Sequence, residues 1–277
     1  MKVLTHPSTK LSQLTLAALT AIEVIAVTPA HASLTPIAIY YGAGSAIDVS
    51  PNRNNGTFSG LYEQDAFNLA TGSFTAPDIS AYNLQKYSGY TLSLWFNYNG
   101  TPATLSNGTF LGQDNGSGER PKWFLAYDYS NPGPANNKFT LHFNNDGSNP
   151  RVFLTSNLVS PPISGWHQLV VTKEARAVDF YFDGNNVGTT LYGGITPDPS
   201  APLTMGTLEA CCGFRGLMSD IALYEEAESA SQVLQAFEAG RHATPATEPT
   251  SNALVLLACA ILLCFSRRRT EVPSCTP

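Results

Sequence analysis

The chain has 277 residues, of which 13% are charged, and its 15 basic and 21 acidic residues give a formal net charge of −6. Proteins that bind nucleic acid or anionic lipid headgroups need a basic surface, so this composition excludes nucleic acid as a main partner. The acidic balance remains compatible with neutral glycans or divalent cations.

Residues 1–32 have the features of a secretory signal peptide. Two lysines make a basic start, residues 11–27 are mostly apolar and small, and Ala30 and Ala32 place small side chains where signal peptidase reads the chain. We expect cleavage after Ala32. Because Glu23 interrupts the apolar stretch, an uncleaved anchor or a buried helix is the alternative.

Residues 33–242 are predicted to form one all-β domain. Charged residues are sparse there, while asparagine, glycine, threonine, serine and aromatic residues are abundant, which is typical of a turn-rich extracellular domain. One helix is expected near the end, capped by Ser229, with Val233, Leu234 and Phe237 on one face and Gly240 at its end. The predicted strands are residues 37–41, 91–98, 123–129, 138–143, 152–154, 166–172, 178–182, 185–190 and 221–224.

Residues 165–184 predict a hairpin most clearly. Val178, Phe180 and Phe182 alternate with more polar neighbours, so one strand face is apolar and the other is solvated. The Asp-Gly pair at 183–184 is typical of a tight turn before the next strand. This pattern indicates a fold but does not point to a catalytic or binding function.

The end of the chain predicts an attachment signal. Residues 243–252 form a Pro/Thr-rich linker, residues 253–269 combine an apolar run with three arginines, and residues 270–277 form a tail. The apolar run is shorter than the about 20 residues that span a bilayer comfortably. The arginines would hold its end at the cytoplasmic face of a membrane.

This order of linker, apolar run and arginines resembles the PEP-CTERM sorting signal of bacterial surface proteins. Thr247, Glu248 and Pro249 match its Pro-Glu-Pro box, with threonine in place of the first proline, and the terminal cluster is Arg267, Arg268 and Arg269. The resemblance implies an exosortase as a processing partner. It also implies a place at the bacterial surface, in the outer envelope or in the extracellular matrix, with at least transient membrane attachment. A single-span tail anchor is the alternative.

Four motifs in order resemble the laminin-G-like (LamG) family of the concanavalin A-like lectin/glucanase superfamily. They are an Asp-led polar loop at 48–60, a Trp-ended strand at 90–96, the Trp-His hairpin at 165–184, and a closing strand with its helix at 214–240. The resemblance implies an antiparallel jelly-roll sandwich. It leaves the ligand open, because this fold carries lectins, adhesion modules and hydrolases.

The resemblance also implies a calcium site. Members of the family often bind calcium where the first loop meets the closing strand, which makes Asp48 and Asp220 the candidate ligands. Calcium needs six to eight oxygen ligands, usually carboxylates and backbone carbonyls. The alternative is an Asx-turn at Asp48 and a buried, hydrogen-bonded Asp220.

A sugar platform is the second candidate site. Strand alternation puts Trp123, Tyr127 and Tyr129 on one face and Phe124 and Ala126 on the other. If the tryptophan face is open, it offers flat rings to a glycan, and if it points inward, it is core. Loops expected at 107–118 and 144–149 are rich in Asn and Asp and could line such a site.

Two further sets of residues bear on chemistry. The string from Glu63 to Asn68 is the nearest approach to the paired carboxylates of a glycoside hydrolase, but its second glutamate is missing and a solvated loop is expected. Cys211 and Cys212 are the cysteines of the predicted domain. They could form a vicinal disulfide, link to another chain or remain free thiols.

These features predict an exported, non-enzymatic recognition or adhesion protein of a bacterial surface. It would bind glycan or protein in an extracellular polysaccharide matrix. A polysaccharide-active hydrolase or lyase, and a purely structural matrix protein, are the alternatives.

Overall fold

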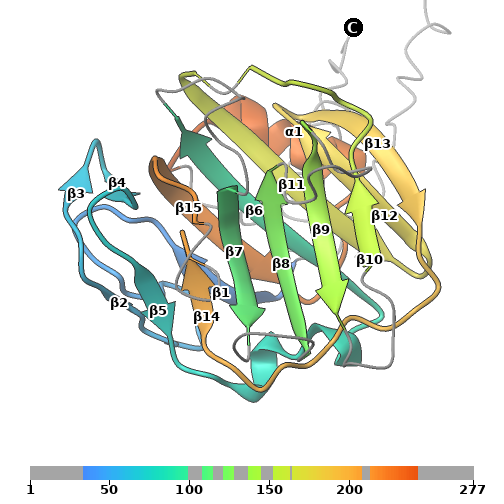
Figure 1. The fold of residues 1–277 in the computed structure, drawn as a ribbon, viewed down its shortest axis with the longest axis horizontal. Coiled ribbons are helices and arrows are strands. Elements are labelled where there is room, and N and C mark those ends of the chain that lie inside the picture. Colours follow the sequence, from blue (N-terminus) through green and yellow to red (C-terminus); the bar gives the residue numbers. More distant parts are fainter. Residues whose placement is uncertain are drawn as a thin grey trace, which may run out of the picture. The chain divides into compact units, whose positions relative to one another are not determined.

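Two antiparallel sheets stack as a jelly-roll sandwich, with one short α-helix, as the sequence predicts (Figure 1). The computed structural model describes residues 34–98, 108–114, 121–127, 137–144, 152–162, 164–207 and 213–242. Figure 1 shows β7, β8 and β9 in front and the helix α1 behind.

The eight-stranded sheet runs in the order β13-β12-β11-β6-β15-β4-β3, and β1 pairs with β15. Its strands are β1 (Pro36–Tyr40), β3 (Tyr62–Glu63), β4 (Ala66–Asn68), β6 (Gly89–Asn97), β11 (Trp166–Glu174), β12 (Ala177–Phe182), β13 (Asn185–Leu191) and β15 (Leu217–Tyr224).

The seven-stranded sheet runs in the order β10-β9-β8-β7-β14-β5-β2. Its strands are β2 (Thr57–Phe58), β5 (Phe74–Ala76), β7 (Gly108–Asp114), β8 (Lys122–Tyr127), β9 (Phe139–Asn144), β10 (Val152–Thr155) and β14 (Leu203–Met205). Two short 3₁₀ turns, Ser80–Tyr82 and Leu84–Lys86, precede β6.

The predicted hairpin forms as β11 and β12. Val171 lies opposite Phe180 and Leu169 opposite Phe182, and these four side chains belong to the main core. Asp183 and Gly184 have φ angles of 48° and 75°, the left-handed conformation that a two-residue hairpin turn requires. The turn leads into β13, so the Asp-Gly prediction is confirmed.

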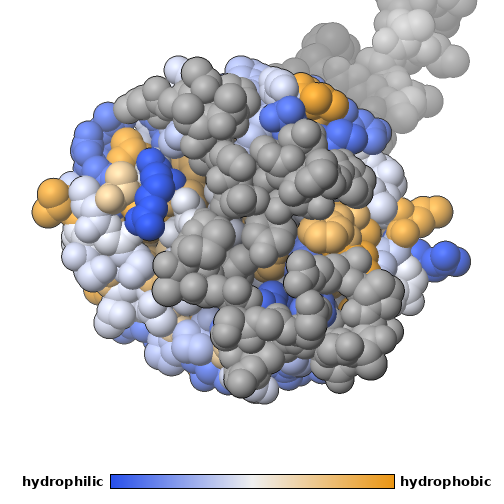
Figure 2. Space-filling view, viewed as in Figure 1, coloured by the Kyte–Doolittle hydropathy of each residue, from blue (hydrophilic) through white to orange (hydrophobic). Residues whose placement is uncertain are grey.

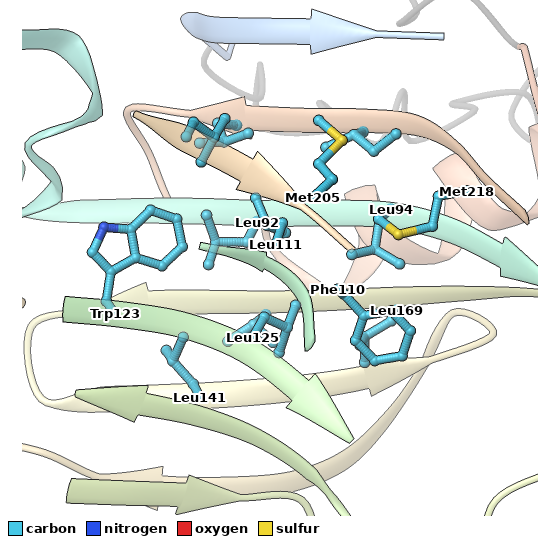
Figure 3. Close-up of a cluster of buried hydrophobic side chains, with 14 of the residues drawn as sticks. Leu92, Leu94, Phe110, Leu111, Trp123, Leu125, Leu141, Leu169, Met205 and Met218 are labelled. Carbon is cyan, nitrogen blue, oxygen red and sulfur yellow. The ribbon is translucent and has the colours of Figure 1, made fainter. Parts of the chain in front are cut away.

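Alternate residues of both sheets fill the space between them. Figure 3 shows Trp123 and Leu125 of β8 and Leu141 of β9 together with Leu92 and Leu94 of β6, which belongs to the other sheet. These side chains are fully buried. Removal of this apolar area from water is the main contribution to the stability of such a sandwich.

The helix α1 (Ala230–Ala239) packs on the outer face of the eight-stranded sheet. Ser229 caps it, and Gly240 ends it with a φ of 80°, as expected. Val233 contacts Val170 and Tyr181 of the sheet. Phe237 stacks on Trp95 at a centroid distance of 5.7 Å. The helix therefore covers one outer face of the sandwich by apolar contact.

Several strands of the two sheets are not predicted from the sequence. The prediction of a loop over residues 107–118 is wrong for Gly108–Asp114, which form β7 between β8 and β14. The short strands β2, β3, β4, β5 and β14 are further elements that the sequence does not predict. Pairing with neighbouring strands makes such segments extended, although their own residues have only a weak preference for strand conformation.

Several predictions lie outside the described residues. They are the signal peptide with Ala30 and Ala32, Tyr129, the pair Cys211 and Cys212, the linker with Thr247, Glu248 and Pro249, and the apolar run with Arg267, Arg268 and Arg269 and its tail. Within the part of the chain that the structure describes, no helix is both long enough and apolar enough to cross a membrane.

Candidate functional site

Strand alternation on β8 decides which residues face out of the sandwich. Trp123 and Tyr127 are fully buried in the main core. The prediction that these two rings form an open sugar platform is therefore wrong. The indole Nε1–H of Trp123 donates to Oε1 of Gln113 at 2.9 Å, which satisfies its polar atom inside the core. Phe124 and Ala126 alternate with these residues along β8, so their side chains point to the outer face of the seven-stranded sheet.

Three rings stand side by side on this outer face. Phe124 pairs in register with His142, and His142 pairs with Phe153 on the next strand. The ring of Phe124 stacks on His142 at 4.4 Å with an interplanar angle of 17°, and Phe153 meets His142 edge-on at 4.6 Å. Figure 2 views the molecule from the side of the seven-stranded sheet.

Charged and amide groups lie beside the rings. Lys122 is in register with Asn144 on one side and with Asp114 on the other. The Nζ atom of Lys122 lies 3.3 Å from Oδ1 of Asp114, and the two side chains are only 5% and 7% exposed. Because a buried charge is costly unless it is paired, this ion pair neutralises the face locally.

A row of small residues crosses the same face. Thr109 of β7, Ala126 of β8, Thr140 of β9 and Thr155 of β10 lie in register. The hydroxyl oxygens of Thr109 and Thr140 are buried and have no hydrogen-bond partner. Buried polar atoms are almost always paired in proteins, so two such hydroxyls on one face require an explanation.

Strands β7 and β8 approach each other most closely at Gly112. A Cβ atom there would lie 2.4 Å from the carbonyl oxygen of Trp123 and 2.5 Å from Cβ of Phe124. Only glycine allows the two strands to pair this closely next to the Phe124 ring. The glycine is part of the scaffold that holds the outward side chains.

Asp48, the first predicted calcium ligand, is saturated by protein donors. Its Oδ1 accepts from the backbone N–H groups of Ile39 and Ser50 at 2.9 Å each, and its Oδ2 accepts from Ser50 Oγ at 2.9 Å and Asn54 N–H at 2.7 Å. The Asx-turn is therefore present at this position. Four donors leave this carboxylate little capacity for a cation.

Asp220, the second predicted ligand, occupies a bulge in β15 with a φ of 51°. Its Oδ1 accepts from the backbone N–H of His242 at 2.8 Å, and burial raises the pKa of its carboxyl. The neighbouring Arg241 lies over the ring of Trp166 at 3.5 Å. Asp220 thus ties the end of the described domain to the sheet.

Within the described ranges, no three His, Cys, Asp or Glu side chains gather as a metal site. Asp48 and Asp220 make separate sets of contacts. Calcium therefore stays a prediction from the resemblance, and the residues present give it little support.

The carboxylate string from Glu63 to Asn68 forms the β3–β4 hairpin and not a loop. Gln64 and Asp65 take φ angles of 52° and 54° in its turn, and Glu63 accepts a hydrogen bond from Asn68 at 2.8 Å. Glu63 and Asp65 are exposed. A tight turn accounts for these residue types without catalysis.

The hairpin residues His167 and Asp183 contact each other. The Nδ1 atom of His167 lies 2.8 Å from Oδ2 of Asp183, whose Oδ1 accepts from the Gln168 N–H at 2.9 Å. The hydrogen bond to Asp183 raises the pKa of His167. This pair ties the start of β11 to the β12–β13 turn, which is the scaffold role that the sequence indicates.

Solved structures with the same fold are similar to this chain over about three quarters of its length. Domain 4 of AbnA, an extracellular arabinanase from Geobacillus stearothermophilus solved in complex with arabinotriose, has a TM-score of 0.55 at 17% identity and covers 73% of this chain and 98% of its own. The receptor-binding domain of botulinum neurotoxin C/D mosaic serotype has a TM-score of 0.54 at 11% identity. The binding domain of botulinum neurotoxin DC in complex with rat synaptotagmin II has a TM-score of 0.53 at 13% identity.

Both toxin matches cover 74% of this chain, which spans about half (51%) of each toxin domain. At these identities the similarity shows the fold. No curated protein sequence matches the chain significantly. The family model described as Concanavalin A-like lectin/glucanases superfamily, a laminin G family, matches residues 68–234. The four spaced motifs and the jelly-roll sandwich agree with this match, and the chain belongs to this laminin G family of the concanavalin A-like superfamily.

Proposed function

We propose that this protein is an exported surface or envelope protein that recognises glycan on the outer face of its seven-stranded sheet. The observation that carries the proposal is the stack of Phe124, His142 and Phe153 on a face that points away from the core. Flat rings bind the apolar faces of sugars, and neighbouring polar groups then fix their orientation. Asn144 and the Lys122–Asp114 pair lie in register on the same face, and we propose that they bond sugar hydroxyls.

Burial sets a condition on this binding. Phe124 is fully buried and His142 is 2% exposed. A sugar therefore reaches these rings only after a local opening of the face. Such an opening lowers the apparent affinity by the fraction of open molecules, so we expect moderate affinity and slow association.

We prefer recognition over hydrolysis because the described strands of this sheet do not supply two carboxyl groups. Glycosidases use two carboxyl groups that flank the scissile bond. In the described strands of the seven-stranded sheet, Asp114 is the one acidic residue, and Lys122 pairs with it. We therefore propose a binding protein. An assay for release of reducing ends from any glycan that binds tests the hydrolase alternative directly.

The similar structures are compatible with this proposal. Domain 4 of AbnA was solved with arabinotriose, and cell entry of botulinum neurotoxin type C is dependent upon interaction with two ganglioside molecules. The toxin domain solved with rat synaptotagmin II contains a protein partner on the same fold. An extracellular protein partner is therefore the other form that recognition by this chain could take.

A glycan array with the purified full-length chain tests the proposal. We expect binding to a restricted set of glycans, and a loss of affinity of about tenfold for Phe124→Leu, which keeps an apolar side chain but removes the flat ring. The control is Leu191→Ala, since Leu191 is 70% exposed on the other sheet. An array that stays blank, with and without calcium, contradicts glycan recognition.

Export and attachment have their own test. We propose that the N-terminal segment is removed after Ala32 and that the C-terminal segment attaches the protein to the membrane at least transiently. Cell fractionation with mass spectrometry of both termini checks this. A mature protein in the envelope fraction that begins at Ser33 supports export, and an intact Arg267–Arg269 cluster on it contradicts exosortase processing.

A further inference from the structure

The imidazole ring of His167 has a hydrogen-bond acceptor at each of its two nitrogen atoms. Nδ1 lies 2.8 Å from Oδ2 of Asp183, and Nε2 lies 3.2 Å from the backbone carbonyl oxygen of Ser164. Carbonyl and carboxylate oxygens only accept hydrogen bonds, whereas a neutral histidine has one N–H group to donate. The ring therefore makes both hydrogen bonds only as imidazolium, with a proton on each nitrogen.

Three segments of the chain meet at this ring. Ser164 lies at the end of the connection from β10 in one sheet to β11 in the other, and His167 lies at the start of β11. Asp183 lies in the turn between β12 and β13, and its Oδ1 accepts from the Gln168 N–H at 2.9 Å. Loss of one ring proton therefore removes one of the contacts that hold the β10–β11 connection to this turn.

One charged group acts on the ring among the described residues. Phe182 of β12 stacks on His167 at a centroid distance of 4.9 Å, and Phe96 of β6 lies at 6.0 Å, so both neighbouring strands present apolar side chains. Asp183 is the charged group, and its hydrogen bond raises the pKa of His167 above the ordinary 6.5, while burial has a smaller, opposite effect. The side chains of His167 and Asp183 are 14% and 25% exposed, so solvent protons reach the pair in the folded state.

We propose that His167 is a pH-sensitive latch, which as imidazolium holds the β10–β11 connection to the β12–β13 turn and loosens when it loses a proton. The pKa of His167 is higher in the folded state than in the unfolded chain. The stabilisation is therefore fully present below pH 6.5 and is lost as the pH rises through the folded-state pKa. The domain is closed most firmly in mildly acidic surroundings. This inference goes beyond glycan recognition and does not depend on it.

NMR of the ring nitrogens of His167 in the full-length chain tests the charge of the latch. We expect a proton on both nitrogens at about pH 6 and a titration midpoint above 6.5. Asp183→Asn keeps an oxygen for the Gln168 N–H and tolerates the left-handed backbone of the turn, but it removes the charge. It should therefore lower the midpoint of His167. A wild-type midpoint at or below 6.5, or one that Asp183→Asn leaves unchanged, overturns the proposal.

Hydrogen exchange at the Gln168 N–H tests whether the protonated ring holds the segments together. After correction for the intrinsic rise of exchange with pH, protection should fall as the pH rises from about 6 to about 8. The fall should be about tenfold for each unit by which the folded-state pKa of His167 exceeds 6.5. His167→Gln has a neutral side chain that donates to only one acceptor, so its protection should not follow the pH. Equal pH dependence in the variant and the wild type would show that the ring proton does not hold these segments.

Two further variants separate His167 from other titrating groups. Both measurements are repeated in the Glu228→Gln background, because burial raises the pKa of Glu228 to about 7 and its titration also changes stability in this range. His242→Gln removes a histidine that pairs with a different carboxylate, Asp220, and should leave the His167 titration and the Gln168 exchange unchanged. If either variant abolishes the pH dependence of Gln168 protection, that dependence does not come from His167 and the latch is overturned.

Discussion

Glu228 is a carboxyl group held under the start of α1. Its backbone N–H donates to Oγ1 of Thr91 at 2.8 Å, and its Oε2 atom is buried without a hydrogen-bond partner. Tyr181 of β12 and Tyr224 of β15 are the titratable neighbours from the sheet. Burial raises the pKa of Glu228 to about 7.

This burial predicts a pH-dependent stability. The folded state holds the Glu228 proton up to about pH 7, whereas the unfolded chain releases it near the ordinary glutamate pKa of 4.5. The stabilisation is therefore fully present below pH 4.5 and is lost as the pH rises to about 7, by about 3 kcal/mol. Urea unfolding of Glu228→Gln should show a flatter pH profile and greater stability than wild type at pH 8.

Glu238→Gln is the control, because it removes an exposed charge from the same helix. If Glu228→Gln follows the wild-type profile between pH 4.5 and pH 8, the carboxyl is not held in the dry environment that the structure describes.

Some properties of single residues can be predicted from the sequence and others cannot. Alternation on β8 correctly divides its residues between two faces. It does not say which face is inside, because Trp123 and Phe124 are both compatible with a core. The Asx-turn at Asp48 can be foreseen as an alternative because Asp48, Ser50 and Asn54 are close in sequence, whereas the contact with Ile39 requires the fold.

At the scale of elements, the hairpin turn and the helix stabilise each other. The turn at Asp183-Gly184 lies beneath α1, so that a Cβ on Gly184 would approach Leu234 Cδ1 to 3.0 Å and Phe237 Cβ to 3.2 Å. The same glycine has a φ of 75°, which disfavours any side chain. The turn is thus restricted by its own backbone and by the helix packed on it.

Gly184→Ala separates these two restrictions. Left-handed backbone costs a residue with a Cβ about 1 to 2 kcal/mol, and the contacts with α1 should raise the total loss of unfolding free energy to about 2 to 3 kcal/mol. Gly44→Ala is the control, since Gly44 has a φ of 72° and no atom within 4 Å of the added Cβ. Urea unfolding should show a larger loss for Gly184→Ala, and equal losses would mean that α1 is not packed on the turn.

The elements that the sequence predicts are those with strong local patterns. The β11–β12 hairpin has clear alternation, the turn from β12 to β13 has an Asp-Gly pair, and α1 has both caps. By contrast, β7 contains Gly108, Gly112 and Asp114, which are poor strand formers, and it exists because β8 and β14 pair with it. Missing β7 also hides the candidate site, since Thr109 and Asp114 lie on it.

For the whole molecule, family membership could be predicted because four motifs occur in order over most of the domain. The binding face could not, since it depends on which strands become neighbours. Phe124, His142 and Phe153 lie on three separate strands and form one stack only through the register of β8, β9 and β10. Their residue types alone would indicate ordinary core.

The charge of the molecule gives a final prediction about its ligand. The chain has a net charge of −6, so an anionic polysaccharide would be repelled, and on the proposed face Lys122 is paired with Asp114. Screening shortens the reach of charge from about 10 Å at 0.1 M salt to about 3 Å at 1 M. Affinity for a neutral glycan should therefore change by less than about twofold between these conditions, as titration calorimetry can measure. Binding that weakens steeply as salt rises would instead mean that a cationic surface attracts an anionic ligand, and would contradict recognition of a neutral sugar on this face.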